Sequence, residues 1–263
     1  MGTPTKKGSI KVDLSFVYKC TKEILKYSKR KKIIVTKSTV PVGTGDEIEK
    51  ILKKKKKLFT VISNPEFLRE GEAIRDFRYP DRIVIGSNEK KAFNIMRKLY
   101  APLTNKGSKF FTTSRRGAEL IKYASNAFLA TKITFINELA NLCEKSGVNI
   151  EDISLGMGSD SRIGGRFLRA GPAYGGSCFP KDTKGLVSAA EKYKINLSVV
   201  KSVIKSNQER VNLLTKRVHK ILGSNLKNKK ISFLGVTFKP NTDDMRDSSS
   251  PVSYTHLRAH ETQ

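Results

Sequence analysis

Short apolar runs alternate with helical patterns over the first part of the chain. Apolar residues recur at helical spacing in residues 13–27, 45–54 and 90–100, and Asp13 is the expected N-cap of the first helix. Short runs rich in β-branched or aromatic residues are typical of strands, and they lie at 32–36, 59–63, 82–87 and 110–112. We expect the strand at 32–36 to be buried. This alternation predicts a parallel α/β sheet.

The pattern becomes helical after residue 114. A long helix is predicted over 116–146, and Gly147 suits the left-handed conformation that closes it. A glycine-rich loop at 164–176 precedes helices predicted at 182–194 and 199–222. The run KKISFLG at 229–235 predicts a fresh strand, the first of a second α/β domain.

The last residues of the chain show neither the apolar spacing of a helix nor the alternation of a strand. Residues 252–262 read VSYTHLRAHET and resemble a translated sequencing adapter, so we leave this tail out of the expected fold. The predicted division is a partial α/β domain, a central helical domain, the start of a second α/β domain and a non-native tail: 1–113, 114–228, 229–250 and 251–263.

Charge is the most unusual feature of the composition. The 263 residues include 51 Lys and Arg against 24 Asp and Glu, a net charge of +27. This excess raises the question of a nucleic-acid partner. The densest lysine run, 53–57, contains no aromatic residue that could stack on a base, so a solvated surface is the simpler interpretation. We expect no nucleic acid, no membrane partner and a cytoplasmic location, because no signal peptide or apolar run of spanning length is present.

One of the three cysteines has an unusual context. Cys20 and Cys143 lie on apolar helical faces and are expected to be small buried residues. Cys178 lies in GGSCFPKD, after two glycines and close to Pro180 and Lys181. A helix N-terminus and a nearby lysine both favour the thiolate that a nucleophilic cysteine requires, although a small cysteine in a tight turn explains the pattern equally well. The cysteines are too widely spaced for a zinc site, and no metal is expected.

Several long motifs, in the same order, resemble the UDP-glucose/GDP-mannose dehydrogenase family. They are TKSTVPVGTG (36–45), SNPEFLREG (63–71), YPDRIVIG (79–86), AELIKYASNAFLATKITFINE (118–138), GGSCFPKD (175–182) and FKPNTDDMRDS (238–248). The variants are closest to the UDP-glucose branch, and Ser177 disfavours the N-acetylmannosamine branch, which typically has a histidine there. The resemblance implies an NAD-dependent, four-electron oxidation of UDP-glucose to UDP-glucuronate through a cysteine thioester. It also implies that residues 1–113 are the C-terminal part of a Rossmann-type NAD-binding domain, with a partial parallel sheet, and that residues 229–250 begin a Rossmann-type UDP-binding domain. GDP-mannose is the alternative substrate.

The resemblance also implies roles for individual residues. Lys122 and Asn126, four positions apart on one helix face, would hold an oxyanion, although a polar helical stripe is the simpler interpretation of that spacing alone. The implied catalytic residues are Cys178, Lys122, Asn126, Asp182, Glu66 and Thr39. The implied substrate-binding residues are Glu70, Arg162, Phe167, Arg169, Tyr174, Gly175 and Lys239. The implied cofactor-binding residues are Thr39, Glu70, Lys181 and Arg246.

The sequence departs from the family pattern in its first domain. No G-x-G-x-x-G turn is present, and Gly43 and Gly45 lack the spacing to replace it. We expect both ends to be truncated, and the chain by itself neither to bind NAD tightly nor to turn over. The helix at 116–146 resembles the family's dimer-forming element, so we expect a homo-oligomer, a dimer or higher. A non-enzyme alternative is a dimerisation fragment without activity.

Overall fold

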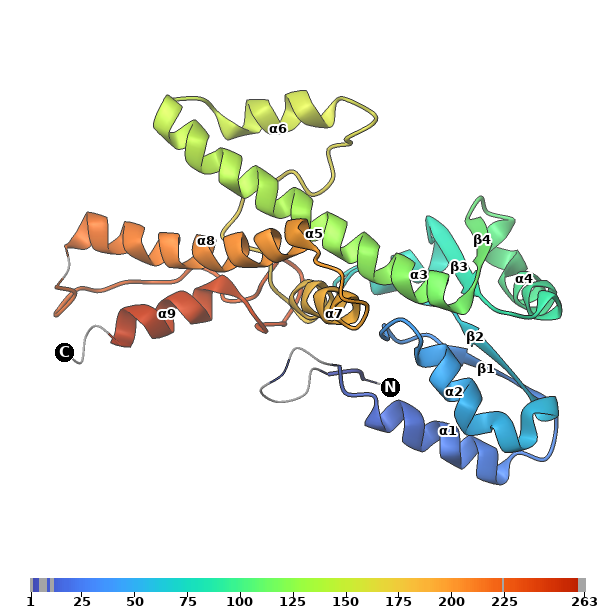
Figure 1. Ribbon diagram of the computed structural model, residues 1–263. Coiled ribbons are helices and arrows are strands. Elements are labelled where there is room, and N and C mark those ends of the chain that lie inside the picture. The colour runs from blue at the N-terminus through green and yellow to red at the C-terminus, as the bar shows by residue number, and fades with distance from the viewer. Residues whose placement is uncertain (1, 5–8, 10–11, 224, 260–263) are drawn as a thin grey trace. The chain divides into compact units, whose positions relative to one another are not determined.

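The computed structural model describes residues 2–4, 9, 12–223 and 225–259, which form two compact units (Figure 1). Unit 1 comprises Met1–Ser125 and Glu191–Tyr193, and unit 2 comprises Asn126–Ala190 and Lys194–Gln263. The long helix α5, Arg115–Ser146, contributes residues to both units. None of the helices in the described part of the chain is long and apolar enough to cross a membrane.

Unit 1 is built on a four-stranded sheet with the order β1-β2-β3-β4. Its strands are β1 (Lys32–Thr36), β2 (Phe59–Ser63), β3 (Arg82–Gly86) and β4 (Lys109–Thr113). Its helices are α1 (Ser15–Tyr27), α2 (Thr44–Leu52), α3 (Ala73–Arg78) and α4 (Lys90–Thr104), with a 3₁₀ turn at Lys53–Leu58. The predicted strands and helices are therefore present, most of them within a few residues of their expected bounds.

Helices cover both faces of this sheet (Figure 1). Successive side chains of a strand point to opposite faces, so Val61 and Ile62 of β2 enter different clusters. Val61 packs with the buried residues of α1 and α2, whereas Ile62 packs with those of β3 and α4. Burial of these aliphatic side chains on two faces gives unit 1 its three-layer core.

Three details of unit 1 differ from the prediction. The sheet is mixed: β1–β2 and β3–β4 are parallel, but β2 meets β3 antiparallel at Ser63 and Gly86. Strand β1 is only half-buried, because it lies at the edge of the sheet. The N-cap of α1 is Leu14, and Asp13 instead accepts a 2.9 Å hydrogen bond from the Ser15 amide.

Unit 2 is helical in the part of the chain that is described. Residues of α5 from Asn126 onward join α6 (Ile150–Gly158), α7 (Phe179–Glu191), α8 (Ser198–Leu222) and α9 (Ser249–Ala259). Ala130 of α5, Val203 of α8 and Tyr174 of the intervening loop form its buried apolar cluster. Helix α5 ends at Ser146, and the φ of 73° at the following Gly147 confirms the predicted left-handed C-cap.

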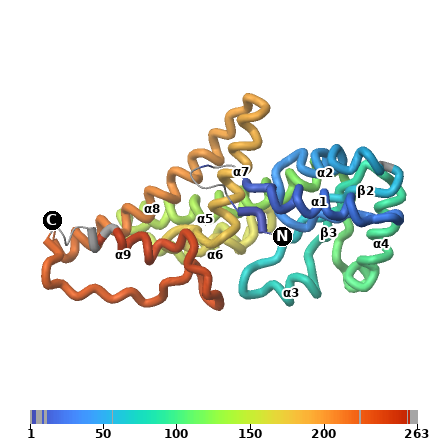
Figure 2. The backbone as a smooth tube through the Cα atoms, turned by 90° about the horizontal axis from the view of Figure 1, so that it is seen from below, coloured from blue at the N-terminus to red at the C-terminus, as the bar shows by residue number. Residues whose placement is uncertain are grey.

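Two expectations about the C-terminal region were wrong. Residues 229–235 form no strand, because unit 2 offers no β-strand among its described residues with which they could pair. The segment left out of the expected fold is helical as far as Ala259, since α9 packs along α8 (Figures 1 and 2). Leu257 is only 5% exposed, and the ring of Tyr254 meets that of Phe233. Residues 260–262 of that segment lie outside the described residues.

Candidate active site

Cys178 lies immediately before the first residue of α7 and is exposed. Its carbonyl oxygen accepts a 2.8 Å hydrogen bond from the Asp182 amide, so the cysteine is joined to the first turn of that helix. Pro180 lies within this turn, where a missing amide proton costs no hydrogen bond. The predicted place of the thiol at a helix N-terminus is confirmed. Of the other cysteines, Cys143 is buried as expected, whereas Cys20 is only partly buried.

The carboxylate of Asp182 is buried and receives two donors. Asn126 of α5 donates a 2.6 Å hydrogen bond from its side-chain amide, and the Lys181 ammonium lies 2.7 Å from the other carboxylate oxygen. Asp182 is 1% exposed, so these partners replace water around a charged group. Unit 2 thus brings together Cys178, Lys181, Asp182 and Asn126 at the start of α7.

Lys122 and Glu66 meet within unit 1. The ammonium of Lys122 is buried, 3.6 Å from a Glu66 carboxylate oxygen and 5.2 Å from the centre of the Phe67 ring. Glu66 and Glu70 both lie in the loop between β2 and α3. Thr39 lies in the loop after β1, and its carbonyl accepts a 3.0 Å hydrogen bond from Thr3.

The loop before Cys178 carries further expected substrate-binding residues. Phe167 has a φ of 67°, and its ring and that of Tyr174 both lie about 6 Å from the ring of Phe179. Tyr174 is buried, and burial is the main cause that raises its pKa above the ordinary value. Arg162, in contrast, is exposed and paired with Asp160.

Two side chains of α8, which the sequence did not single out, hold this loop. Asn207 accepts a hydrogen bond from the Tyr174 amide (2.9 Å) and donates one to the Tyr174 carbonyl (3.0 Å). The Arg210 guanidinium donates to the Gly171 carbonyl, while Asn137 of α5 accepts from the Gly171 amide. These pairs join residues 33 to 39 positions apart, and no local pattern identifies them.

The motif at 238–248 packs directly on the cysteine loop. The Gly176 amide donates a 2.8 Å hydrogen bond to the Arg246 carbonyl. Arg246 also pairs with Asp244 at 2.8 Å, and the Lys239 ammonium lies over the Phe238 ring. The hydrogen bonds from Arg246 lower the pKa of Asp244 to about 2. The expected residues Lys239 and Arg246 therefore share unit 2 with Cys178.

Comparison with known families decides the relationship of the chain. Residues 1–104 match the NAD binding domain of the UDP-glucose/GDP-mannose dehydrogenase family, and residues 116–209 match the central domain of that same family. The chain belongs to the UDP-glucose/GDP-mannose dehydrogenase family.

Individual members of this family are similar over nearly the whole chain. The UDP-glucose 6-dehydrogenase of Rhizobium meliloti (strain 1021) is 51% identical over 252 residues, which are 94% of this chain and 58% of that protein. The UDP-glucose 6-dehydrogenase YwqF of Bacillus subtilis (strain 168) is 47% identical, over 98% of this chain and 58% of its own. The solved UDP-glucose dehydrogenase of Pyrobaculum islandicum is 35% identical with a TM-score of 0.93, covering 99% of this chain and 61% of its own. The chain thus spans less than two thirds of these relatives.

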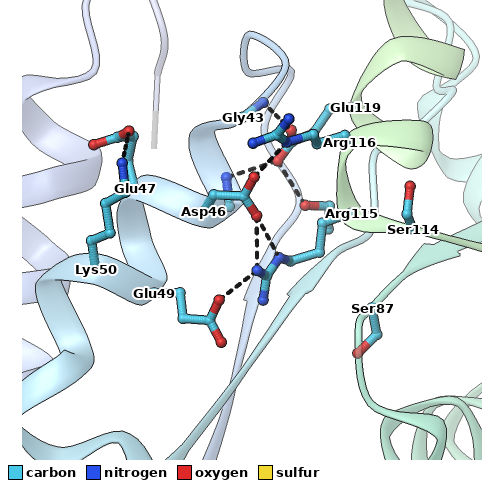
Figure 3. A network of polar contacts seen from close by, with 12 residues as sticks. Gly43, Asp46, Glu47, Glu49, Lys50, Ser87, Ser114, Arg115, Arg116 and Glu119 are labelled. Atoms are coloured by element: carbon cyan, nitrogen blue, oxygen red, sulfur yellow. Dashed lines mark hydrogen bonds and ion pairs between the residues drawn. The ribbon is translucent and has the colours of Figure 1, made fainter.

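A carboxylate of the chain itself is bonded to the amides at the N-terminus of α2, the helix that follows β1 (Figure 3). The buried carboxylate of Glu119, from α5, accepts hydrogen bonds from the Gly43 and Gly45 amides at 2.7 and 2.8 Å, and one from Ser63. Burial raises the pKa of Glu119 above its ordinary value, and these three hydrogen bonds offset the effect only in part. The amides of Gly43 and Gly45 are already bonded to the chain's own carboxylate, and they form no cradle for a dinucleotide phosphate.

Proposed function

We propose that the chain carries the cysteine-containing region of an NAD-dependent UDP-glucose 6-dehydrogenase. The whole protein would oxidise the C6 hydroxyl of UDP-glucose to the carboxylate of UDP-glucuronate. The observation that carries this proposal is the exposed Cys178 at the start of α7, next to a buried Asp182 that is bonded to Asn126. The family relationship supplies the substrate class and the cofactor.

The proposed reaction removes four electrons in two steps. NAD, when bound, would supply the hydride acceptor for both steps, so one UDP-glucose would yield two NADH. After the first step the Cys178 sulfur would add to the C6 aldehyde, and the second step would convert the resulting thiohemiacetal to a thioester. Water then attacks the thioester carbonyl, the C–S bond breaks, and the thiol and the carboxylate are released.

The residues that the family pattern singles out suit these steps chemically. A buried lysine or asparagine side chain stabilises an oxyanion strongly where water is excluded, and both Lys122 and Asn126 are buried. Glu66 would assist hydrolysis of the thioester, and Thr39 and Asp182 would orient the attacking water. Glu70, Arg162, Phe167, Arg169, Tyr174, Gly175 and Lys239 would bind the sugar nucleotide. Each of these roles is a proposal that the family pattern suggests.

The described residues do not by themselves fit the dinucleotide phosphates. The sequence has no G-x-G-x-x-G turn, and Glu119 already bonds to the N-terminal amides of α2. Thr39, Glu70, Lys181 and Arg246 are the chain's proposed contribution to NAD binding. We therefore expect the 263-residue chain alone to bind NAD weakly and to produce no NADH.

We also propose that two copies associate through α5. Three large apolar side chains at seven-residue spacing are exposed on this helix within unit 2: Phe128 is 66% exposed, Phe135 47% and Leu142 62%. Side chains seven apart lie on one helix face, so they form a stripe that a second copy could cover. We call these three residues the α5 stripe.

The test begins with the reading frame that encodes the chain and its genomic flanks. If an upstream G-x-G-x-x-G and a downstream α/β domain are in frame, the protein encoded by the whole frame should form two NADH per UDP-glucose. Its Cys178→Ala variant should form no UDP-glucuronate, whereas a matched Cys143→Ser variant should keep the activity. NADH formation with GDP-mannose and none with UDP-glucose would overturn the proposed substrate.

A further inference from the structure

The carboxylate of Glu119 joins α5 to two other segments of unit 1. Its Oε2 atom accepts the Gly43 amide at 2.7 Å, and its Oε1 atom accepts the Gly45 amide at 2.8 Å and the Ser63 hydroxyl at 2.9 Å. Gly43 ends the loop that carries Thr39, and Ser63 is the last residue of β2. Glu119 is only 3% exposed, so these hydrogen bonds are shielded from water.

Arg115 adds a second contact between α5 and the start of α2. It lies four positions before Glu119, on the same face of α5. Its buried guanidinium donates to Asp46 at 2.8 Å and to Glu49 at 2.6 Å (Figure 3). A Cβ atom at Gly45 would lie 3.0 Å from a Glu119 oxygen and 3.1 Å from the Arg115 side chain. The two helices therefore pack closely here, and neither can slide along the other without breaking charge-assisted hydrogen bonds.

Two contacts join α5 to residues 63–66. Lys122 follows Glu119 by three positions on α5, and residues three apart on a helix share a face. Glu66 follows Ser63 by the same number of positions. The Lys122 ammonium lies 3.6 Å from the Glu66 Oε1 atom, while Oε2 of Glu66 accepts the Leu68 amide at 2.5 Å. The Lys122–Glu66 pair is too weak to set its own distance, because the Glu66 side chain is 31% exposed and water competes with the ammonium.

We propose that Glu119 is a positioning residue for Lys122 and Glu66. By holding Ser63 and the amides of α2, it fixes the register of α5 against residues 63–66. That register sets the distance between the Lys122 ammonium and the Glu66 carboxylate. Glu119 touches neither substrate nor cofactor in this role. The inference rests on the proposed roles of Lys122 and Glu66, but its first test uses neither substrate nor cofactor.

Carbodiimide cross-linking measures this contact directly. The reagent activates a carboxylate, and an amine in contact with it forms an amide as the reagent leaves as its urea. The yield of the Lys122–Glu66 amide is measured by peptide mass spectrometry in the 263-residue chain and in two variants. Glu119→Gln loses one of the two carboxylate oxygens as an acceptor, and Ser63→Ala removes only the hydroxyl donor.

Two controls separate a change of register from a general loss of stability. Glu49→Gln removes a partner of Arg115 from the same pair of helices and leaves Ser63 untouched. The amide between Lys205 and Glu209 of α8, whose charged atoms lie 3.7 Å apart, is measured in every sample as an internal standard.

We expect the yield of the Lys122–Glu66 amide to fall about tenfold in Glu119→Gln, as the loss of a charge-assisted hydrogen bond implies. It should fall less in Ser63→Ala, where Glu119 keeps two of its three bonds, and it should be unchanged in Glu49→Gln. Unaltered yields in Glu119→Gln and Ser63→Ala would overturn the proposal, as would an equal fall in Glu49→Gln. If the internal standard shows that Glu119→Gln is unfolded, the yield in Ser63→Ala decides.

Kinetics of the whole protein give a second test. Glu119→Gln should lower kcat about tenfold or more and leave KM for UDP-glucose within about twofold, because misplaced reacting groups slow the chemistry without weakening substrate binding. A raised KM with an unchanged kcat would overturn the positioning role. A whole protein that failed to oxidise UDP-glucose would overturn the proposed function and leave the cross-linking result standing.

Discussion

The side-chain amide of Asn126 donates a 2.6 Å hydrogen bond to the carboxylate of Asp182, and both groups are buried. Helices α5 and α7 are thereby joined through polar atoms within unit 2. The other oxygen of Asp182 is engaged by Lys181, so removal of the amide leaves one buried oxygen without its donor.

Substitution of Asn126 should therefore destabilise the chain. Asn126→Ala should lower the free energy of unfolding by about 1–3 kcal/mol, because a buried charged acceptor loses its partner. Asn126→Asp should cost more, since two buried carboxylates would face each other. Urea unfolding checks both values. Asn212 is exposed on α8 and provides the control: the free energy of unfolding of Asn212→Asp should stay within about 0.5 kcal/mol of that of the original chain. Equal stability of Asn126→Asp and the control would contradict the contact.

The raised pKa of Glu119 predicts an unusual pH dependence. Burial raises this pKa in the folded state, so the folded chain takes up a proton before the unfolded chain does. Stability from this group should therefore increase as the pH falls from neutral through the raised value. Glu119→Gln cannot titrate, and its oxygen cannot replace both carboxylate oxygens that face Gly43, Gly45 and Ser63.

Unfolding of Glu119→Gln and the original chain at matched pH values tests this point. We expect the variant to be less stable by about 1–3 kcal/mol at neutral pH, and the gap to widen on acidification. The exposed Glu47, in the second half-turn of α2, provides the control Glu47→Gln. If the difference in unfolding free energy between the original chain and Glu119→Gln narrowed on acidification, the pKa of Glu119 would not be raised in the folded state.

The lowered pKa of Asp244 predicts a pH dependence of stability opposite to that of Glu119. Hydrogen bonds from Arg246 hold its pKa at about 2 in the folded state, below the ordinary value. The stability that this carboxylate contributes should be present above about pH 4 and lost as the pH falls towards 2. Because the Arg246 side chain is largely exposed, we discount the shift to about 1–2 kcal/mol. Asp244→Asn should lack this pH dependence, and identical acid profiles would refute the assignment.

The two hydrogen bonds between Asn207 and Tyr174 predict the order of the loop before Cys178. Asn207→Ala should cost about 1–2 kcal/mol and speed hydrogen exchange at the Tyr174 amide, because both backbone groups lose their partner. The next residue of α8 is exposed, and Gln208→Ala should leave both quantities unchanged. Unaltered exchange at Tyr174 in Asn207→Ala would show that the loop is held by other contacts.

The α5 stripe predicts self-association of the chain. Phe128→Glu combined with Phe135→Glu should convert a dimer to a monomer in light scattering, because charged side chains oppose burial of this face. Leu99→Glu makes an equally exposed change on α4 and should leave the mass unaltered. A monomer before any substitution would remove the proposal.

Local signals predicted much of unit 1 and little of what holds the site together. Strand β2 was predictable residue for residue, because Phe59–Ser63 is rich in aromatic and β-branched residues and is followed by Asn64. The antiparallel contact between β2 and β3 was not. Residues 64–81 connect these strands and include the short α3, and a connection of this length allows either direction, so the local pattern does not fix it.

The two errors in the C-terminal region have different physical causes. Residues 229–235 have a high strand propensity, but a strand forms only where a neighbour completes its hydrogen bonds, and propensity alone carries no such information. Helix α9 has almost no apolar periodicity, and its contact with α8 decides its conformation. GGSCFP predicted the place of Cys178, whereas the hydrogen bonds between Gly176 and Arg246 and between Asn207 and Tyr174 join residues that are close only in the folded chain.

The carboxylate of Glu119 competes with free anions for the amides at the N-terminus of α2, and it is attached to the same chain. A free phosphate arriving at Gly43 and Gly45 would have to displace an ion that is covalently attached to the same molecule, with an effective concentration in the millimolar range or above. Free anions are therefore kept from the N-terminus of α2 because its amides are already bonded to Glu119, and not because the site has the wrong shape. A redesign that aimed to recruit a nucleotide there would need to begin at residue 119, within α5, rather than in the glycine turn itself.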